Sequence, residues 1–331
     1  MRALSNSFGL RSVDFRTALN VSPATFSELL KKNGVYSEKD PPKKGASKVI
    51  QPNEARGIFE KRGFSYPKTA RVLSFMMCKG GVGKTTSALY LAQRLSTYGA
   101  KVLVIDADSQ GNLTSALALD RFKFEVDEST PILVDVLTGA ATIEEAIVAV
   151  TPTFHIIPSN PLNATLEGKI REAFKNPSLP IKRAIEPLLS RYEFIIFDCA
   201  PALNLTNTAI ISASHQVILP VSPDKFSQLG LNQTLKEIDQ IEKDFNVSLD
   251  KKIIFTKFDA REFTSLKYLA DIANEHSDKR FQTAIRTCAD VKNAITKRED
   301  LFSMKKSAAR ADYDAFAKEI LGLDRAFKAQ V

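Results

Sequence analysis

The residues from Cys78 to Thr86 have the composition of a phosphate-binding loop, since they read Cys-Lys-Gly-Gly-Val-Gly-Lys-Thr-Thr. Glycines let the backbone curl so that successive N–H groups point at one anion, and a helix that follows adds the positive end of its dipole. In this pattern the lysine before the first threonine reaches the β- and γ-phosphates, and the threonine hydroxyl binds Mg²⁺. We therefore predict a nucleotide-binding loop formed by Lys79, Gly80, Gly81, Val82, Gly83, Lys84, Thr85 and Thr86.

Three aspartates stand at the ends of predicted strands further along the chain. Asp106 ends an apolar run, Asp108 follows two residues later, and Asp198 ends a second run, Phe-Ile-Ile-Phe. Because the carboxyl ends of parallel strands meet at one edge of a sheet, we expect these carboxylates beside the phosphate loop. Acidic groups there hold Mg²⁺-bound water or orient the attacking water. We predict that the Mg²⁺ site consists of Thr85, Asp106 and Asp198.

The elements that must position these residues follow a regular order. From Arg71 onward, short apolar strands alternate with amphipathic helices, a pattern typical of a parallel sheet covered on both faces. The expected fold class is α/β, a P-loop NTPase with a mostly parallel twisted sheet flanked by helices. The last helix is expected at 308–321. The expected strands are residues 72–77, 101–106, 154–158, 193–198, 216–221, 252–256 and 281–285.

The N-terminal region has a different pattern, with two short helices on either side of a turn at residues 20–22. Ser22 is a suitable N-cap for the second helix, and Pro23 suits its first position. A basic loop at 36–48 and a helix at 52–62 follow. We predict a winged helix-turn-helix in residues 1–66, with an N-terminal arm, ahead of an ATPase domain in residues 67–331. A basic helical extension that contributes dimer contacts is the alternative interpretation. Lys31 and Lys32 would face DNA.

The composition excludes several classes of protein. The chain has 331 residues, 44% hydrophobic and 25% charged, as in soluble globular proteins. No apolar run is long enough for a membrane span, and the first ten residues lack the apolar stretch of a signal peptide. Three scattered cysteines give neither a disulfide framework nor a zinc site. We expect a cytoplasmic protein.

The positive charge lies at the two ends of the chain. Residues 1–70 carry 13 Lys and Arg against 6 Asp and Glu, and residues 251–331 carry 17 against 12, whereas the whole chain has a net charge of +8. Two basic clusters around a slightly acidic middle indicate a polyanionic partner, although a solvated basic surface explains either cluster taken alone.

Three motifs in order resemble those of one superfamily. Cys78 replaces the first glycine of the usual loop and Lys79 is added, so the loop resembles the deviant Walker A box of the ParA/MinD superfamily. Residues 106–112 are similar to the D-x-D-x-Q-G-N switch of ParA ATPases, and Asp198-Cys-Ala-Pro-Ala is similar to the family's D-A-P pattern. The chain is thereby identified as a ParA-type partition ATPase of the longer plasmid type, with an N-terminal helix-turn-helix.

The resemblance implies a Mg²⁺-dependent enzyme that hydrolyses ATP to ADP and phosphate. Its catalytic residues would be Lys79, Lys84 and Asp108, with Lys79 reaching the ATP of the other subunit in a homodimer that encloses two ATP molecules. A ParB-type centromere-binding partner would stimulate hydrolysis and release the dimer from DNA. The cycle would segregate a plasmid or chromosome, with the protein on the nucleoid and not on a membrane.

The resemblance also implies DNA contacts. The segment from Thr256 to Arg261 is similar to a family strand that ends in T-x-x-D-x-R, in which the arginine binds DNA nonspecifically. Residues 286–298 match the family's next DNA-binding segment poorly, so Lys292 is assigned by position only, with Lys297 and Arg298 enlarging the basic surface. The N-terminal region would bind operator DNA for autoregulation.

Two other functions fit the same features. One is a MinD-like positioning ATPase that cycles on a membrane, and the other is a transcriptional repressor whose nucleotide only sets its DNA-binding state. A reductase of the nitrogenase iron-protein type shares the phosphate loop, but the three scattered cysteines disfavour it, because it needs paired cluster cysteines.

Overall fold

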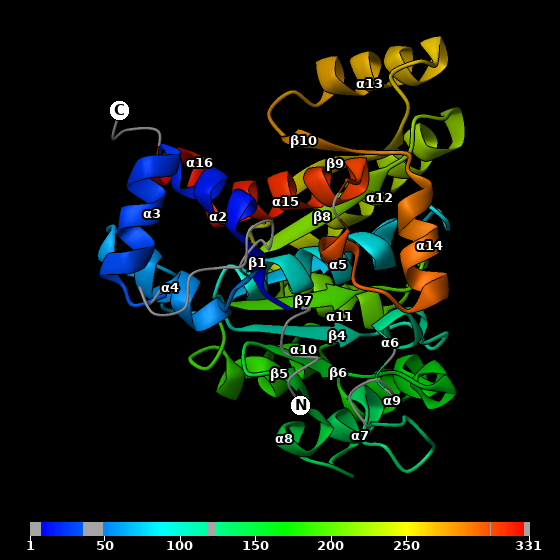
Figure 1. The fold of residues 1–331 in the computed structure, drawn as a ribbon. Coiled ribbons are helices and arrows are strands. Elements are labelled where there is room, and N and C mark those ends of the chain that lie inside the picture. Colours follow the sequence, from blue (N-terminus) through cyan, green and yellow to red (C-terminus); the bar gives the residue numbers. More distant parts are fainter. Residues whose placement is uncertain (1–7, 36–48, 118, 120–123, 305, 328–331) are drawn as a thin grey trace.

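In a computed structural model, an eight-stranded sheet forms the centre of the molecule, with strand order β10-β9-β8-β3-β7-β4-β6-β5 (Figure 1). The structure describes residues 8–35, 49–117, 119, 124–304 and 306–327. The predicted wing, within 36–48, and most of the predicted N-terminal arm therefore lie outside the described residues.

The predicted parallel sheet is confirmed. The pairs β3–β7, β3–β8, β4–β6, β4–β7, β8–β9 and β9–β10 are all parallel. An edge strand that the sequence analysis missed, β5 (Val148–Thr151), pairs with β6 in the antiparallel direction. The parallel strands are β3 (Arg71–Phe75), β4 (Val102–Asp106), β6 (Phe154–Ile157), β7 (Phe194–Asp198), β8 (Gln216–Val221), β9 (Asp250–Phe258) and β10 (Arg280–Arg286).

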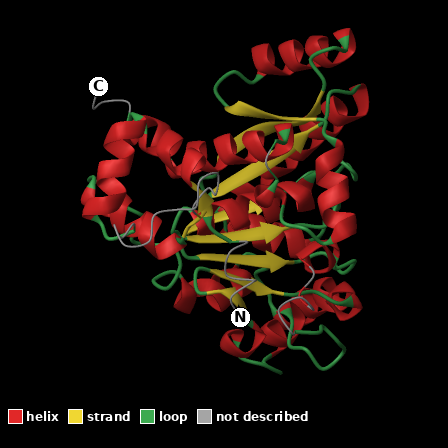
Figure 2. Cartoon of the chain, viewed as in Figure 1, coloured by secondary structure: helices red, strands yellow, loops and turns green. Residues whose placement is uncertain are grey.

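The central strands are buried on both faces because helices cover both sides of the sheet (Figure 2). Their β-branched and aromatic residues suit this position. In β7, Phe194 and Ile196 enter one hydrophobic core, and Ile195 and Phe197 enter the other. This alternation is the physical reason for the continuous apolar runs in the sequence.

Helices α5 and α15 pack together on the first of these cores, and α11 and α12 pack against the second. No helix in the described part of the chain is long and apolar enough to cross a membrane. The helices after β3 are α5 (Lys84–Thr97), α6 (Asn112–Leu117), α7 (Leu133–Thr138), α8 (Ile143–Ala146), α9 (Leu166–Ala173), α10 (Leu179–Ile185), α11 (Leu205–Ala213), α12 (Lys225–Phe245), α13 (Phe263–Glu275), α14 (Ala289–Lys297), α15 (Ala308–Leu321) and α16 (Leu323–Ala326), with short 3₁₀ turns η2 (Pro161–Thr165), η3 (Glu186–Leu188) and η4 (Leu301–Ser303).

The N-terminal helices are α2 (Ser12–Leu19), α3 (Pro23–Lys32) and α4 (Pro52–Lys61), and β1 (Leu10–Arg11) pairs with β2 (Val49–Ile50). The predicted turn is confirmed, because α2 ends at Asn20 in the left-handed region (φ 51°) and the Ser22 hydroxyl accepts a hydrogen bond from the Thr25 N–H at 3.2 Å. Its use as a DNA-binding motif stays a prediction.

These N-terminal helices share a core with the ATPase helices. Phe59 of α4 stacks on Phe327 at a ring-centroid distance of 5.8 Å and contacts Tyr98, just after α5. Phe64 and Tyr66, at the predicted boundary between residues 1–66 and 67–331, are buried, and the Tyr66 hydroxyl donates to the Tyr98 carbonyl at 2.6 Å. Phe64 and Tyr66 therefore pack against the ATPase helices, and the N-terminal helices share a hydrophobic cluster with them.

Candidate nucleotide-binding site

The phosphate loop joins the end of β3 to the start of α5, as its sequence predicts. Gly81 and Gly83 have φ values of 72° and 87°, a region that residues with a Cβ rarely adopt. Gly83 is the N-cap of α5, so the first free N–H groups of this helix face the loop. A phosphate placed there would receive backbone N–H donors and the positive end of the helix dipole.

Lys84 lies inside this loop and is 7% exposed. Its ammonium donates to the Lys79 carbonyl at 3.3 Å. Burial lowers the pKa of Lys84, and the negative charge of Asp198 opposes that shift. A phosphate group would add the negative charge that a buried ammonium requires.

The predicted acidic residues meet at one edge of the sheet. Asp106 and Asp198 are directly opposite each other on neighbouring strands, and both are fully buried. Burial raises the pKa of Asp106 to about 6, and hydrogen bonds from the Thr114 hydroxyl and N–H, at 2.7 and 2.9 Å, oppose the shift. Burial, and then the charge of Asp106, raise the pKa of Asp198, while the Thr85 hydroxyl and Lys84 oppose it.

This carboxylate pair suits a divalent cation. Within the described residues, neither carboxylate oxygen of Asp198 accepts a hydrogen bond of good geometry. A buried carboxylate without a partner is costly, and a cation next to it removes that cost. No group of three or more His, Cys, Asp or Glu side chains in the described segments is arranged to hold a metal. Mg²⁺ does not need such a group, because one or two protein oxygens plus nucleotide phosphates suffice.

Asp108 is held at the same edge, 8% exposed. Its carboxylate accepts from the Gln110 N–H at 3.0 Å, and its carbonyl accepts from the Ser159 hydroxyl at 2.7 Å. Thr114 and Ser159 were missed from the sequence. Ser159 comes two residues after β6, and its position at the carboxyl end of a strand was the available signal.

The side chain of Lys79 is directed at the beginning of α12. Its ammonium donates to Asp224 Oδ1 at 2.6 Å and to the Ser227 hydroxyl at 3.0 Å. Asp224 is the N-cap of α12. The sequence analysis did not identify these acceptors, because the contact joins residues 145 positions apart.

The end of β9 is hydrogen-bonded to the phosphate loop. The Thr256 hydroxyl donates to the Val82 carbonyl at 2.7 Å, and the Lys257 ammonium donates to the Gly81 carbonyl at 2.6 Å. A cleft of about 480 Å³ adjoins this point, and it is more apolar than polar. Its lining includes Gly83, Thr86, Thr256, Lys257, Arg286, Thr287, Cys288, Val291, Lys292 and Tyr313.

The predicted DNA-binding residues fall in two separate regions. Arg261 follows β9. Lys292 and Lys297 lie on α14, which follows β10, and Arg298 is the C-cap of that helix. These four residues therefore lie at the edge of the sheet that carries the phosphate loop. The side chain of Arg261 is 89% exposed and pairs with Asp259 at 2.6 Å. The N-terminal pair, Lys31 and Lys32, ends α3 on the opposite side of the molecule (Figure 1).

Comparisons with known proteins decide the family. A profile of the family described as AAA domain matches residues 70–251, more than half of the chain. The sporulation initiation inhibitor protein Soj of Bacillus subtilis is 30% identical over 217 residues, which cover 65% of this chain and 83% of Soj. The chromosome partitioning protein ParA of Caulobacter vibrioides is 29% identical over 261 residues, covering 77% of this chain and 95% of the relative. The chain belongs to the ParA family of partition ATPases.

The ParA-type fold agrees with this assignment. A solved McdA variant from Cyanothece in complex with ATP has a TM-score of 0.69 and 24% identity, covering 77% of this chain and 97% of McdA. The family profile starts at residue 70. The N-terminal helices α2, α3 and α4 therefore lie outside the part that identifies the family.

Proposed function

We propose that this ParA-type protein is a Mg²⁺-dependent ATPase that segregates a plasmid or chromosome. Its ATP-bound form is a homodimer on nucleoid DNA in the cytoplasm, and hydrolysis stimulated by a ParB-type centromere-binding protein releases it. The observation that carries the proposal is the meeting of Lys84, Thr85, Asp106 and Asp198 at one sheet edge. Within the described residues, neither carboxylate oxygen of Asp198 accepts a hydrogen bond of good geometry.

In this proposal each residue has one task. Lys84 and the loop N–H groups bind the β- and γ-phosphates, and Thr85, with Asp106 and Asp198, holds Mg²⁺. The cation neutralises charge that develops on the phosphates during transfer. Asp108 orients the attacking water. The cleft of about 480 Å³ beside Gly83 and Thr86 takes the nucleoside, because it directly adjoins the phosphate loop.

Exposed apolar side chains support a dimer across the nucleotide edge. Leu203 follows β7, Phe226 and Leu229 follow β8, and Phe263 and Leu266 follow β9. Phe226 is 74% exposed and Phe263 is 79% exposed. Large apolar residues gathered on one face of a molecule indicate a protein contact. We assign that contact to a second copy of the chain, with Lys79 reaching the partner subunit's ATP.

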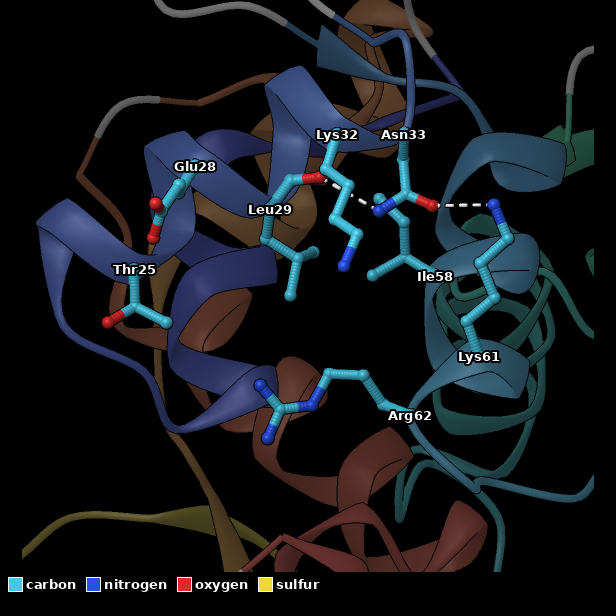
Figure 3. A pocket seen from close by; sticks show the side chains of 8 residues that line it. All are labelled: Thr25, Glu28, Leu29, Lys32, Asn33, Ile58, Lys61 and Arg62. Atoms are coloured by element: carbon cyan, nitrogen blue, oxygen red, sulfur yellow. Dashed lines mark hydrogen bonds between the residues drawn. The ribbon is translucent and has the colours of Figure 1, made fainter.

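DNA binding is assigned to the two basic regions. Arg261, Lys292, Lys297 and Arg298 would bind the backbone of any sequence, which makes binding dependent on salt. The N-terminal residues 1–66 would bind operator DNA. In support, a groove of about 630 Å³ between α3 and α4 is lined by Lys32, Lys61 and Arg62, among others (Figure 3). Figure 3 shows Lys32 and Arg62 extending into the groove from opposite walls.

Turnover measured with and without DNA and the partner protein tests the proposal. Lys84→Ala should weaken ATP binding about 10- to 100-fold, because a charged hydrogen-bond donor is lost. Lys79→Ala should retain ATP binding but lose ATP-dependent dimerisation and turnover. Tight operator binding with no turnover in the presence of DNA and partner would instead establish a repressor. ATP-dependent sedimentation with liposomes, without retention on random DNA, would establish a membrane-cycling ATPase.

A further inference from the structure

Lys79 is held inside its own subunit by the beginning of α12. Its ammonium has three N–H donors, and the contacts to Asp224 and Ser227 use two of them. Lys79 also lies 6.0 Å from the ring centroid of the exposed Phe226. The side chain is therefore directed at α12 in the single subunit.

Asp224 is fixed in place independently of Lys79. As the N-cap of α12, it accepts from the Ser227 N–H at 2.9 Å through Oδ1, and it accepts from the Ser222 hydroxyl at 2.7 Å through Oδ2. Partial burial raises the pKa of Asp224, but the hydrogen bonds from Lys79, Ser222 and Ser227 outweigh burial and leave the pKa below its usual range. The carboxylate is thus held by Ser222 and Ser227 in addition to Lys79.

The contact between the two side chains is accessible enough to be exchanged. Lys79 is 30% exposed and Asp224 is 40% exposed. Ion pairs with this exposure contribute little net stability, because water competes for both groups. A terminal phosphate offers more negative charge and more oxygen acceptors than one carboxylate, so it competes well for the same ammonium.

We propose that Asp224 is a positioning residue that retains Lys79 in the separate subunit and releases it when the nucleotide-bound dimer forms. The proposal rests on the cross-subunit role of Lys79 in the proposed function. Each subunit loses one ion pair when the dimer assembles. This loss raises the nucleotide concentration that dimerisation requires.

The test is Asp224→Asn, which removes the charge but keeps a good N-cap residue for α12. Dimer formation is measured by analytical ultracentrifugation during titration with Mg²⁺ and a non-hydrolysable ATP analogue. We assume that each ion pair disfavours the release of Lys79 from Asp224 by about 5-fold. Because two subunits contribute, the association constant of the dimer should then rise about 25-fold in the variant. Half-maximal dimerisation should accordingly need less nucleotide.

Asp239→Asn is the matched control. Asp239 lies on the same helix and accepts from Lys251 at 2.7 Å, so the variant removes the same charge from another ion pair, and Lys251 keeps Glu242 as a second partner. It should dimerise like the unchanged protein. Asp224→Ser provides a second variant with a capping hydroxyl, and thermal unfolding checks that α12 is intact in each.

The outcomes separate the two proposals. If Lys79→Ala stays monomeric while Asp224→Asn needs as much nucleotide as the unchanged protein, or more, Asp224 does not restrain Lys79 and this inference is wrong. If Lys79→Ala dimerises normally, the cross-subunit lysine itself is wrong, and the role of Asp224 fails with it. Easier dimerisation in both Asp224 variants, and not in Asp239→Asn, supports the inference.

Discussion

Arg94 of α5 donates a hydrogen bond at 3.0 Å to Asp14 of α2, in a contact that is buried on both sides. The same guanidinium donates to Asp314 of α15 at 2.5 Å and lies over the rings of Tyr98 and Phe302. The helix that begins at the phosphate loop is thereby joined through its last turn to the N-terminal helices. Buried hydrogen bonds thus link the helix that follows the nucleotide loop to the predicted DNA-binding module.

Removing Asp14 should destabilise the whole molecule. In Asp14→Ala the buried guanidinium of Arg94 loses an acceptor, as does Arg310, which also pairs with Asp14. Breaking a buried ion pair from one side costs about 3 kcal/mol or more. Urea unfolding should show this loss. Asp271→Ala, at an exposed position of α13, should change the free energy of unfolding by less than about 0.5 kcal/mol. Equal stability of the two variants would contradict the structure.

The same cluster predicts sensitivity to acid. Burial raises the pKa of Asp314, but Arg94 and Lys318 outweigh burial and lower it below the value of a free carboxyl. The folded protein therefore binds the Asp314 proton more weakly than the unfolded chain does. This contribution to stability is present above about pH 4 and is lost as the pH falls further. Unfolding measured from pH 5 to pH 2.5 should show less acid sensitivity in Asp314→Asn, and an unchanged acid profile would refute the assignment.

Asp108→Ala should separate binding from hydrolysis. The phosphate loop and the Mg²⁺ residues are left intact, so ATP should still bind and the dimer should still form. Loss of a group that orients the attacking water should slow turnover about 100-fold or more. Because release depends on hydrolysis, the variant should stay on DNA after the partner is added. Single-turnover hydrolysis and DNA retention are the measurements, and normal turnover would remove Asp108 from the catalytic group.

Much of this architecture was predictable because it depends on short-range signals. The glycine loop, the apolar run before each aspartate and the Ser22–Pro23 helix start are local, and they predicted the parallel sheet, its carboxyl edge and the turn after α2. Contacts between distant segments carry no such signal. Asp224 at Lys79 is one example, and Arg94 between Asp14 and Asp314 is another, since each side chain alone is an ordinary charged residue.

The edge strand β5 was missed for a related reason. Its four residues, Val148–Thr151, are a short run that is separated from α8 by one residue and from β6 by two, so periodicity does not distinguish them from their neighbours. The order of the strands in the sheet could not be predicted either, because it depends on packing. No residue pattern indicates that β3 lies between β7 and β8. The packing of Phe64 and Tyr66 likewise depends on Phe327 and Tyr98, which are remote in sequence.

Arg261→Glu tests whether the basic residues at the nucleotide edge of the sheet bind DNA. Arg261 is almost fully exposed and bound only to Asp259 in the described structure, so reversing its charge should leave the fold unchanged. Retention on random DNA with ATP should weaken, with a smaller dependence on salt, because phosphate contacts are lost. ATP turnover without DNA should be unaffected. Lys169→Glu makes the same charge change on another helix, α9, and equal loss in both variants would indicate a general charge effect.

The N-terminal basic pair should act on operator DNA alone. Lys31 and Lys32 are exposed at the end of α3, on the side of the molecule opposite the nucleotide edge. Replacing both with alanine should abolish binding to the DNA upstream of the protein's own gene, because two phosphate contacts are removed from a small interface. Retention on random DNA should persist, since Arg261 and α14 are unchanged. Lys169→Ala with Lys175→Ala removes the same charge elsewhere and should leave both activities intact. Loss of random-DNA retention in the Lys31 and Lys32 variant would show that the two basic regions form one DNA site, whereas unchanged operator binding would exclude α3 from recognition.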